Sequence, residues 1–147
     1  MTSPKTEYRL PFVTEMEIRF GDADAIGHVN NVAFFRFLEQ GRVHFMKAGK
    51  GNLSGSGIRD FPYVVAHSEL DFVAPLAYDD IVVITMGIGR IGGSSFVFDY
   101  ELFSKRSGVM AAKGNVVMVC FDHDNNRSMP IPEEFRSTLK EYLTDPV

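Results

Sequence analysis

Apolar and polar residues alternate over several stretches of this chain and follow a helical period over one long stretch. The first alternating stretch is 13–20, where Met16, Ile18 and Phe20 are separated by charged residues, as in a half-buried strand. Similar patterns predict four further strands, over 63–72, 81–88, 94–103 and 109–121. The predicted order is therefore one early strand and a later run of four.

A single long helix is predicted between the first strand and the other four, ending near Ala48. Its apolar positions cover two neighbouring sides, so it should be buried on most sides and leave Arg36 on the remaining face. Asn30 or Asn31 suits the N-cap, because its side-chain oxygen can accept a free amide hydrogen of the first turn. Gly41, in the middle of the helix, predicts close contact between the helix and a sheet.

The order of these elements predicts one α+β domain over residues 1–147. Short links between consecutive strands favour antiparallel neighbours, and one long helix against such a sheet is an α+β layer arrangement. A short terminal helix is expected to open at Pro132, followed by Glu133 and Glu134 in its first turn. The glycine-rich stretch 49–60 predicts a connection, either a plain solvent loop or part of a pocket wall.

Composition excludes several classes of protein. The formal net charge of -4, with no basic run, argues against nucleic-acid binding, although a few local Arg or Lys residues could hold an anionic ligand. The single cysteine, Cys120, excludes an intrachain disulfide framework and lies in an apolar strand pattern that favours a buried, inert thiol. No leader pattern and no apolar run of about 20 residues is present, so a soluble cytoplasmic protein without membrane contact is expected.

Two carboxylates, Asp22 and Asp24, stand in the short loop between the first strand and the long helix. The start of a helix presents unpaired N–H groups and a partial positive charge. A carboxylate beside such donors can act as a base or a nucleophile next to an oxyanion site. The alternative is that both aspartates only form the turn and that His28 is an ordinary loop residue.

The segment around this loop, residues 19–42, reads RFGDADAIGHVNNVAFFRFLEQGR. It resembles the signature of the 4-hydroxybenzoyl-CoA thioesterase family, which has the hotdog fold. It supplies the family's positions in order: Phe20, Asp22, Asp24, Gly27, His28, Val29, Asn30, Asn31, Phe34, Glu39 and Arg42. The match is dense here and weaker downstream. It departs at Phe34, where many relatives have a tyrosine hydroxyl, and at Gln40 and Gly41, where Glu-Ala is common.

The resemblance implies an antiparallel sheet wrapped around a long central helix. It also implies an acyl-CoA thioesterase that hydrolyses a thioester to free acid and CoA, without a cofactor. Hotdog proteins pair into homodimers or homotetramers with active sites at the dimer interface. Asp24, the second aspartate of GDAD, matches the family's catalytic position, as general base for water or as nucleophile.

Three residues are expected to hold the thioester itself. Backbone N–H groups near Asn31, at the helix start, and of Gly27 are candidate donors to the thioester oxygen. His28 lies beside the acidic loop and is a candidate contact for the thioester carbonyl. For His28 the alternative is packing or solvent exposure.

A second set of residues is expected to hold the phosphates of CoA. The chain is acidic overall, so an anion needs a local cationic patch. The turn before the fourth strand offers Arg90, with Ser94 and Ser95 as hydroxyl donors, and in family relatives this turn lies near the CoA nucleotide. The alternative is a solvated β-turn.

The other chemical options are weaker. The four histidines lie far apart without an HxxxH or CxxC pair, so no metal is expected, and no GxSxG nucleophile elbow is present. Hotdog dehydratases use a histidine and a carboxylate in a different local pattern, which this chain lacks. A non-catalytic module that binds acyl-CoA or an acyl carrier on the same fold remains the alternative, and acyl length and aromaticity stay open.

Overall fold

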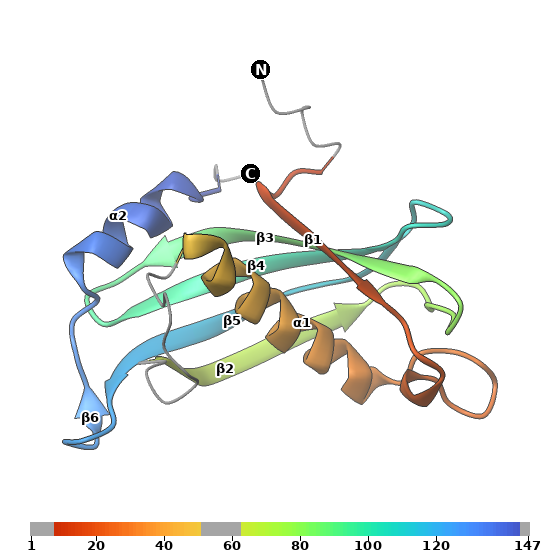
Figure 1. Cartoon of the computed structure of the whole chain (residues 1–147), viewed down its shortest axis with the longest axis horizontal. Helices are drawn as coiled ribbons and strands as arrows, with labels where there is room; N and C mark the ends of the chain where they lie inside the picture. The colour runs from red at the N-terminus through yellow and green to blue at the C-terminus, as the bar shows by residue number, and fades with distance from the viewer. Residues whose placement is uncertain (1–7, 51–62, 145–147) are drawn as a thin grey trace.

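The computed structural model describes residues 8–50 and 63–144 (Figure 1). Its helical elements are a short 3-10 turn, two α-helices and a π-helical turn: Phe20–Asp22, α1 (Asn31–Phe45), Met46–Lys50 and α2 (Glu133–Glu141). Its strands are β1 (Phe12–Glu17), β2 (Tyr63–Phe72), β3 (Ile81–Ile91), β4 (Ser95–Ser104), β5 (Met110–Asp122) and β6 (Arg127–Ser128). From residue 51 on, the predicted glycine-rich connection lies outside the described residues.

The strands form one antiparallel sheet in the order β1-β3-β4-β5-β2, and the short β6 pairs with β5. Figure 1 shows α1 lying across one face of this curved sheet, with α2 beside the far end of β3. This arrangement confirms the α+β class and the hotdog architecture that the resemblance implied. It also leaves β2 at one edge of the sheet.

The core lies between α1 and the sheet. Alternate residues of β4 are fully buried and face the helix: Phe96, Phe98, Tyr100 and Leu102. A Cβ atom at Gly41 would lie 3.1 Å from side-chain atoms of both Ile84 and Met86 on β3. Gly41 therefore lets the helix approach the sheet closely, as predicted.

Two predicted strand ends were wrong. β1 ends at Glu17 instead of residue 20, because the chain turns there and the Asp22 carboxylate accepts the Arg19 N–H at 2.9 Å. β3 continues past residue 88 and Gly89 to Ile91, with a bulge after Ile88, because its backbone keeps pairing with β4. Cross-strand pairing thus overrides the low strand propensity of glycine.

β2 differs from its predicted one-sided pattern because it is an edge strand. A register shift between Val65 and His67 interrupts the alternation, and most of its residues are exposed. Cys120, on the neighbouring β5, is buried as predicted, and burial raises the pKa of its thiol to about 11. Within residues 8–50 and 63–144, no helix is long and apolar enough to cross a membrane.

Candidate active site

The start of α1 is built around Asn30. Its side-chain oxygen accepts the Ala33 N–H at 2.9 Å, so Asn30 is the N-cap that the sequence left open between two asparagines. Its own N–H donates to the Asp22 carbonyl at 3.0 Å, which joins the helix start to the acidic loop. The following amides, of Asn31 and Val32, are first-turn donors that have no acceptor within a helix.

The acidic loop folds tightly around Asp24. The Asp24 N–H donates to the His28 carbonyl at 2.7 Å, and the Gly27 N–H donates to the Asp24 carbonyl at 3.0 Å. Gly27 has a φ of 83°, a left-handed conformation that glycine adopts without strain. Oδ1 of Asp24 accepts the N–H groups of Ile26 and His28 at 3.0 and 3.2 Å. Within the described chain, Oδ2 has no hydrogen-bond partner and remains available.

The two aspartates of the loop have opposite surroundings. Asp22 is only 5% exposed, its Oδ2 accepts the Arg19 N–H, and its Oδ1 forms an ion pair with the Arg36 guanidinium. Asp24 is exposed to solvent. Sequence reasoning placed Arg36 on the outer face of the helix and missed this pair, because no short-range spacing links residues 22 and 36 across the loop.

A cleft of about 300 Å³ brings Asp24, His28 and Asn31 together. Its other walls are apolar and come from the loop, from α1, from the end of β2 and from the segment after it: Val29, Phe34, Phe72, Val73, Ala74 and Pro75. Gly27 does not line this cleft. Among the predicted site residues, the structure thus gathers the carboxylate, the histidine and the helix start.

The segment 73–80 lines part of this cleft and holds the acidic loop. The Val29 N–H donates to the Leu76 carbonyl at 2.8 Å, and His28 forms a bridge with Ala77. The rings of Phe20 and Tyr78 meet edge to face with centroids 5.5 Å apart. The acidic loop therefore docks onto this segment through its backbone and one aromatic pair.

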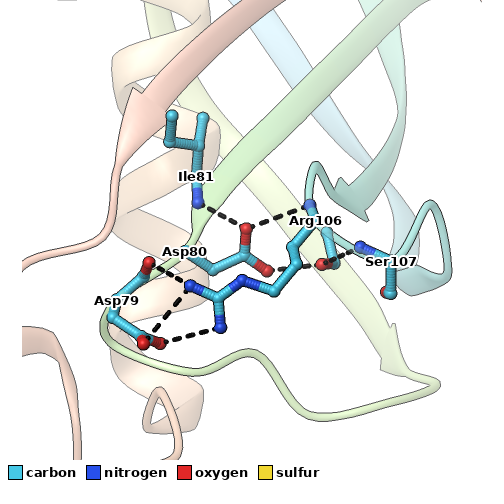
Figure 2. A network of polar contacts seen from close by, with 6 residues as sticks. Asp79, Asp80, Ile81, Arg106 and Ser107 are labelled. Carbon is cyan, nitrogen blue, oxygen red and sulfur yellow. Dashed lines mark hydrogen bonds and ion pairs between the residues drawn. The ribbon is translucent and has the colours of Figure 1, made fainter.

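A polar network at the start of β3 fixes the end of that segment (Figure 2). The Asp80 carboxylate accepts the N–H of Ile81 at 2.7 Å, the N–H of Arg106 at 3.2 Å and the hydroxyl hydrogen of Ser104. Asp79 forms an exposed ion pair with Arg106 at 3.3 Å. Burial alone would raise the pKa of Asp80, but these hydrogen bonds outweigh it and hold its pKa below the usual value.

The residues nominated for CoA lie elsewhere. Arg90 is exposed on the bulged end of β3, Ser94 follows in the turn, and Ser95 opens β4. Figure 1 places this end of β3 beside α2, at the opposite end of the sheet from the acidic loop. Since β3 spans residues 81–91, the two places lie roughly 30 Å apart. One chain alone does not bring Arg90 next to its own Asp24.

An arginine-lined cleft on the acidic loop was not foreseen from the sequence. It measures about 480 Å³ and carries two arginines, Arg19 and Arg36, beside Asp22 and Asn30. Asp22 offsets the charge of Arg36, which leaves one net positive charge among the residues that line this cleft. Elsewhere in the described part of the chain, no group of three or more His, Cys, Asp and Glu side chains is arranged to hold a metal ion.

Known proteins share both this sequence pattern and this fold. The sequence model of the family described as the Thioesterase-like superfamily matches residues 18–139. The chain belongs to this superfamily. The family expected from the sequence and its enzyme class, a thioester hydrolase, are thereby confirmed, whereas the 4-hydroxybenzoyl-CoA subtype is not.

Thioesterase-like proteins similar to this one include two solved structures and a curated relative. "The structure of a predicted thioesterase from Bacillus stearothermophilus" is 32% identical with a TM-score of 0.84, over 92% of this chain and 98% of that one. A thioesterase from Thermus thermophilus, complexed with coenzyme A and Zn, is 28% identical with a TM-score of 0.78, over 94% and 98%. The long-chain acyl-CoA thioesterase FadM of Escherichia coli is 21% identical over 88% of this chain and 98% of its own length.

Proposed function

We propose that this chain hydrolyses acyl-CoA thioesters to the free acid and CoA, with Asp24 as the catalytic carboxylate. The observation that carries the proposal is the cleft in which an exposed carboxylate with a free Oδ2 lies beside the first turn of α1. The names of the relatives support the substrate class, since FadM is a long-chain acyl-CoA thioesterase and the Thermus protein was solved with coenzyme A. We take the whole chain as one domain for this activity.

The proposed chemistry uses the Asn31 amide for the thioester oxygen. As a nucleophile or water attacks the carbonyl carbon, negative charge develops on that oxygen, and a first-turn N–H of α1 is directed to stabilise it. The Gly27 N–H is already bonded to the Asp24 carbonyl, so we assign Gly27 the turn and favour Asn31 as donor. His28 lines the same cleft and is proposed to contact the thioester group.

Asp24 has two possible roles at the carbonyl carbon. As a general base, Oδ2 takes a proton from water while the water oxygen bonds to carbon, and the C–S bond then breaks to release CoA as a thiolate. As a nucleophile, Oδ2 bonds to carbon, CoA leaves with the electron pair of the C–S bond, and water hydrolyses the resulting anhydride. Both routes end in the free acid and CoA.

The test is release of free thiol from a panel of acyl-CoAs that differ in chain length and aromaticity. We expect turnover on at least one class. Acyl-CoA binding without thiol release on any member would contradict hydrolysis and favour a binding module instead.

We also propose a homodimer in which β2 pairs with the β2 of a second copy. The edge of a sheet exposes unpaired N–H and C=O groups. Exposed apolar residues gather along this edge and on the adjoining side of α1: Val32, Phe35, Val65, Phe72 and Val73. The Asp24 cleft opens at the same edge, so a partner there would border the site.

Val65→Lys on β2 should weaken this dimer, because a charged side chain would enter the paired edge. Light scattering should then show monomers, with loss of thioesterase activity, while the native chain is at least a dimer. The matched control is Val109→Lys, an equally exposed valine in the turn after β4, which should leave the assembly unchanged. A native chain that is active as a monomer at assay concentration would refute the proposal.

Arg90→Glu should raise the Michaelis constant for acyl-CoA several-fold at low salt and change turnover much less. The reason is that Arg90, with Ser94 and Ser95, is proposed to attract the CoA phosphates, an effect that salt screens. Because Arg90 lies far from its own Asp24, it would serve the site of the other subunit. Steady-state kinetics at low and high salt measure both constants, with Arg127→Glu on β6 as control.

An unchanged Michaelis constant at low salt would remove Arg90 from the site. Mixing Asp24→Asn chains with Arg90→Glu chains tests the shared site separately. Mixed dimers should recover low-Michaelis-constant activity if one subunit supplies Asp24 and the other Arg90.

A further inference from the structure

Two clefts follow one another between α1 and β2. The first is the Asp24 cleft, which uses Asn31 and Phe34 of the helix and Phe72 at the end of the strand. The second, of about 310 Å³, lies further along both elements: Val32, Phe35, Arg36, Leu38, Glu39, Arg42 and Ser68. Figure 1 shows α1 beginning beside the C-terminal end of β2. The second cleft therefore lies further from the acidic loop than the first.

An aromatic contact stands between the two clefts. The ring of Phe72 meets Phe34 edge to face at 5.2 Å and meets Phe35 in the same manner at 6.4 Å. Phe72 lines the first cleft and Phe35 lines the second. The two rings are 43% and 40% exposed in the single chain, so they form a partition outside the buried core, at the edge where the second copy is proposed to pair.

The lining of the first cleft indicates which end receives the acyl group. Its polar side chains are Asp24, His28 and Asn31, and the remainder of its wall is hydrocarbon. A thioester group at Asp24 would therefore direct its acyl chain along Phe34 towards Phe72. The second cleft begins with more apolar surface, at Val32, Phe35 and Leu38, before its charged residues.

We propose that Phe72, backed by Phe35, limits the length of the acyl chain that this protein accepts. The second cleft is the space that a longer chain occupies once the Phe72 ring is removed. This inference rests on the proposed thioesterase function of the Asp24 cleft. It assigns Phe72 a specificity role and no part in the chemical step.

The experiment measures binding separately from hydrolysis. Non-hydrolysable thioether analogues of straight-chain acyl-CoAs, from acetyl to palmitoyl, are titrated calorimetrically into the native protein and its variants. Affinity should rise about fourfold for each methylene that is buried, until the chain reaches the partition. In Phe72→Ala that limit should move to chains several carbons longer, and Phe35→Ala should move it in the same direction.

Phe121→Ala is the matched control. Phe121 is a partly exposed phenylalanine on β5 whose ring contacts His123, and it lines neither cleft. Its removal should leave the length limit where it is in the native protein. If Phe72→Ala does not fold, Phe72→Leu serves instead, with a smaller shift in the same direction.

Three outcomes separate this inference from the proposed function. A longer limit in the Phe72 variant supports the inference even if no variant releases thiol, in which case only the hydrolysis proposal fails. The same limit in the native protein and the Phe72 variants overturns the inference even if hydrolysis is fast. Absence of binding by every analogue overturns it as well.

Discussion

Asp24→Asn should lower turnover at least ~100-fold while the protein stays folded. The substitution keeps an oxygen that can accept the N–H groups of Ile26 and His28, so the loop keeps its shape. It removes the negative charge that either takes a proton from water or attacks the thioester. Thiol release from the best acyl-CoA of the panel measures the effect.

Asp22→Asn should show the opposite behaviour, with lost stability as the primary effect. It breaks the ion pair between the buried Asp22 carboxylate and the Arg36 guanidinium, whose side chain is 38% exposed, and the loss of such a charged interaction costs roughly 1–3 kcal/mol. Urea unfolding measures this loss, and the turnover of the folded fraction should stay within a fewfold of the native value. If Asp24→Asn kept native turnover and folded Asp22→Asn were inactive, the two roles would be reversed.

Asp122 provides a matched control for Asp24. Its Oδ1 also accepts two backbone N–H groups of the following residues, from Asp124 at 3.0 Å and Asn125 at 3.1 Å. It is the last residue of β5, at the start of the following turn, and it does not line the Asp24 cleft. Asp122→Asn should therefore leave turnover within about twofold, since only the position next to the thioester makes the charge catalytic.

Asp80→Asn should destabilise the protein by about 1–3 kcal/mol at neutral pH. The carboxylate accepts three hydrogen bonds, whereas the amide would place an NH₂ group against one of those donors. Because these bonds lower the pKa of Asp80 in the folded state, its ionised form stabilises the fold above the unfolded pKa, which is about 4. That contribution is lost as the pH falls through the folded pKa.

The stability gap between native protein and Asp80→Asn should thus be full above about pH 5 and shrink below about pH 4. Urea unfolding across this range measures it. Asp79→Asn is the control, because its exposed ion pair with Arg106 should be worth less than about 1 kcal/mol. A gap that stayed constant down to about pH 3 would show that the Asp80 charge does not matter.

The sequence alone predicted the elements that depend on local pattern. The alternation of β4 and β5, the helix cap at the asparagine pair and the contact at Gly41 follow from period, capping chemistry and side-chain size, and all are present. The superfamily followed from the dense match around GDAD.

The contacts that support the site depend on pairing across the chain and were not predicted. Asp80 meets Ser104 and Arg106 only because Val82 pairs with Ser104 in the β3–β4 register. The segment 75–80 carries the acidic loop on its backbone, through Leu76 and Ala77, and its own sequence does not indicate this contact. The ion pair of Asp22 and Arg36 likewise depends on how the loop folds back against α1, and the periodicity of the sequence does not specify this.

The reaction of Cys120 with a thiol reagent can report how often the sheet of this protein opens. It is the one cysteine of a chain without tryptophan, and it is buried on β5, inside the sheet. Its raised pKa keeps it protonated and slow to react at neutral pH. A thiol reagent that is added to measure CoA release therefore reacts little with the folded enzyme itself. The slow rate at which this reagent labels Cys120 measures how often the central strands separate.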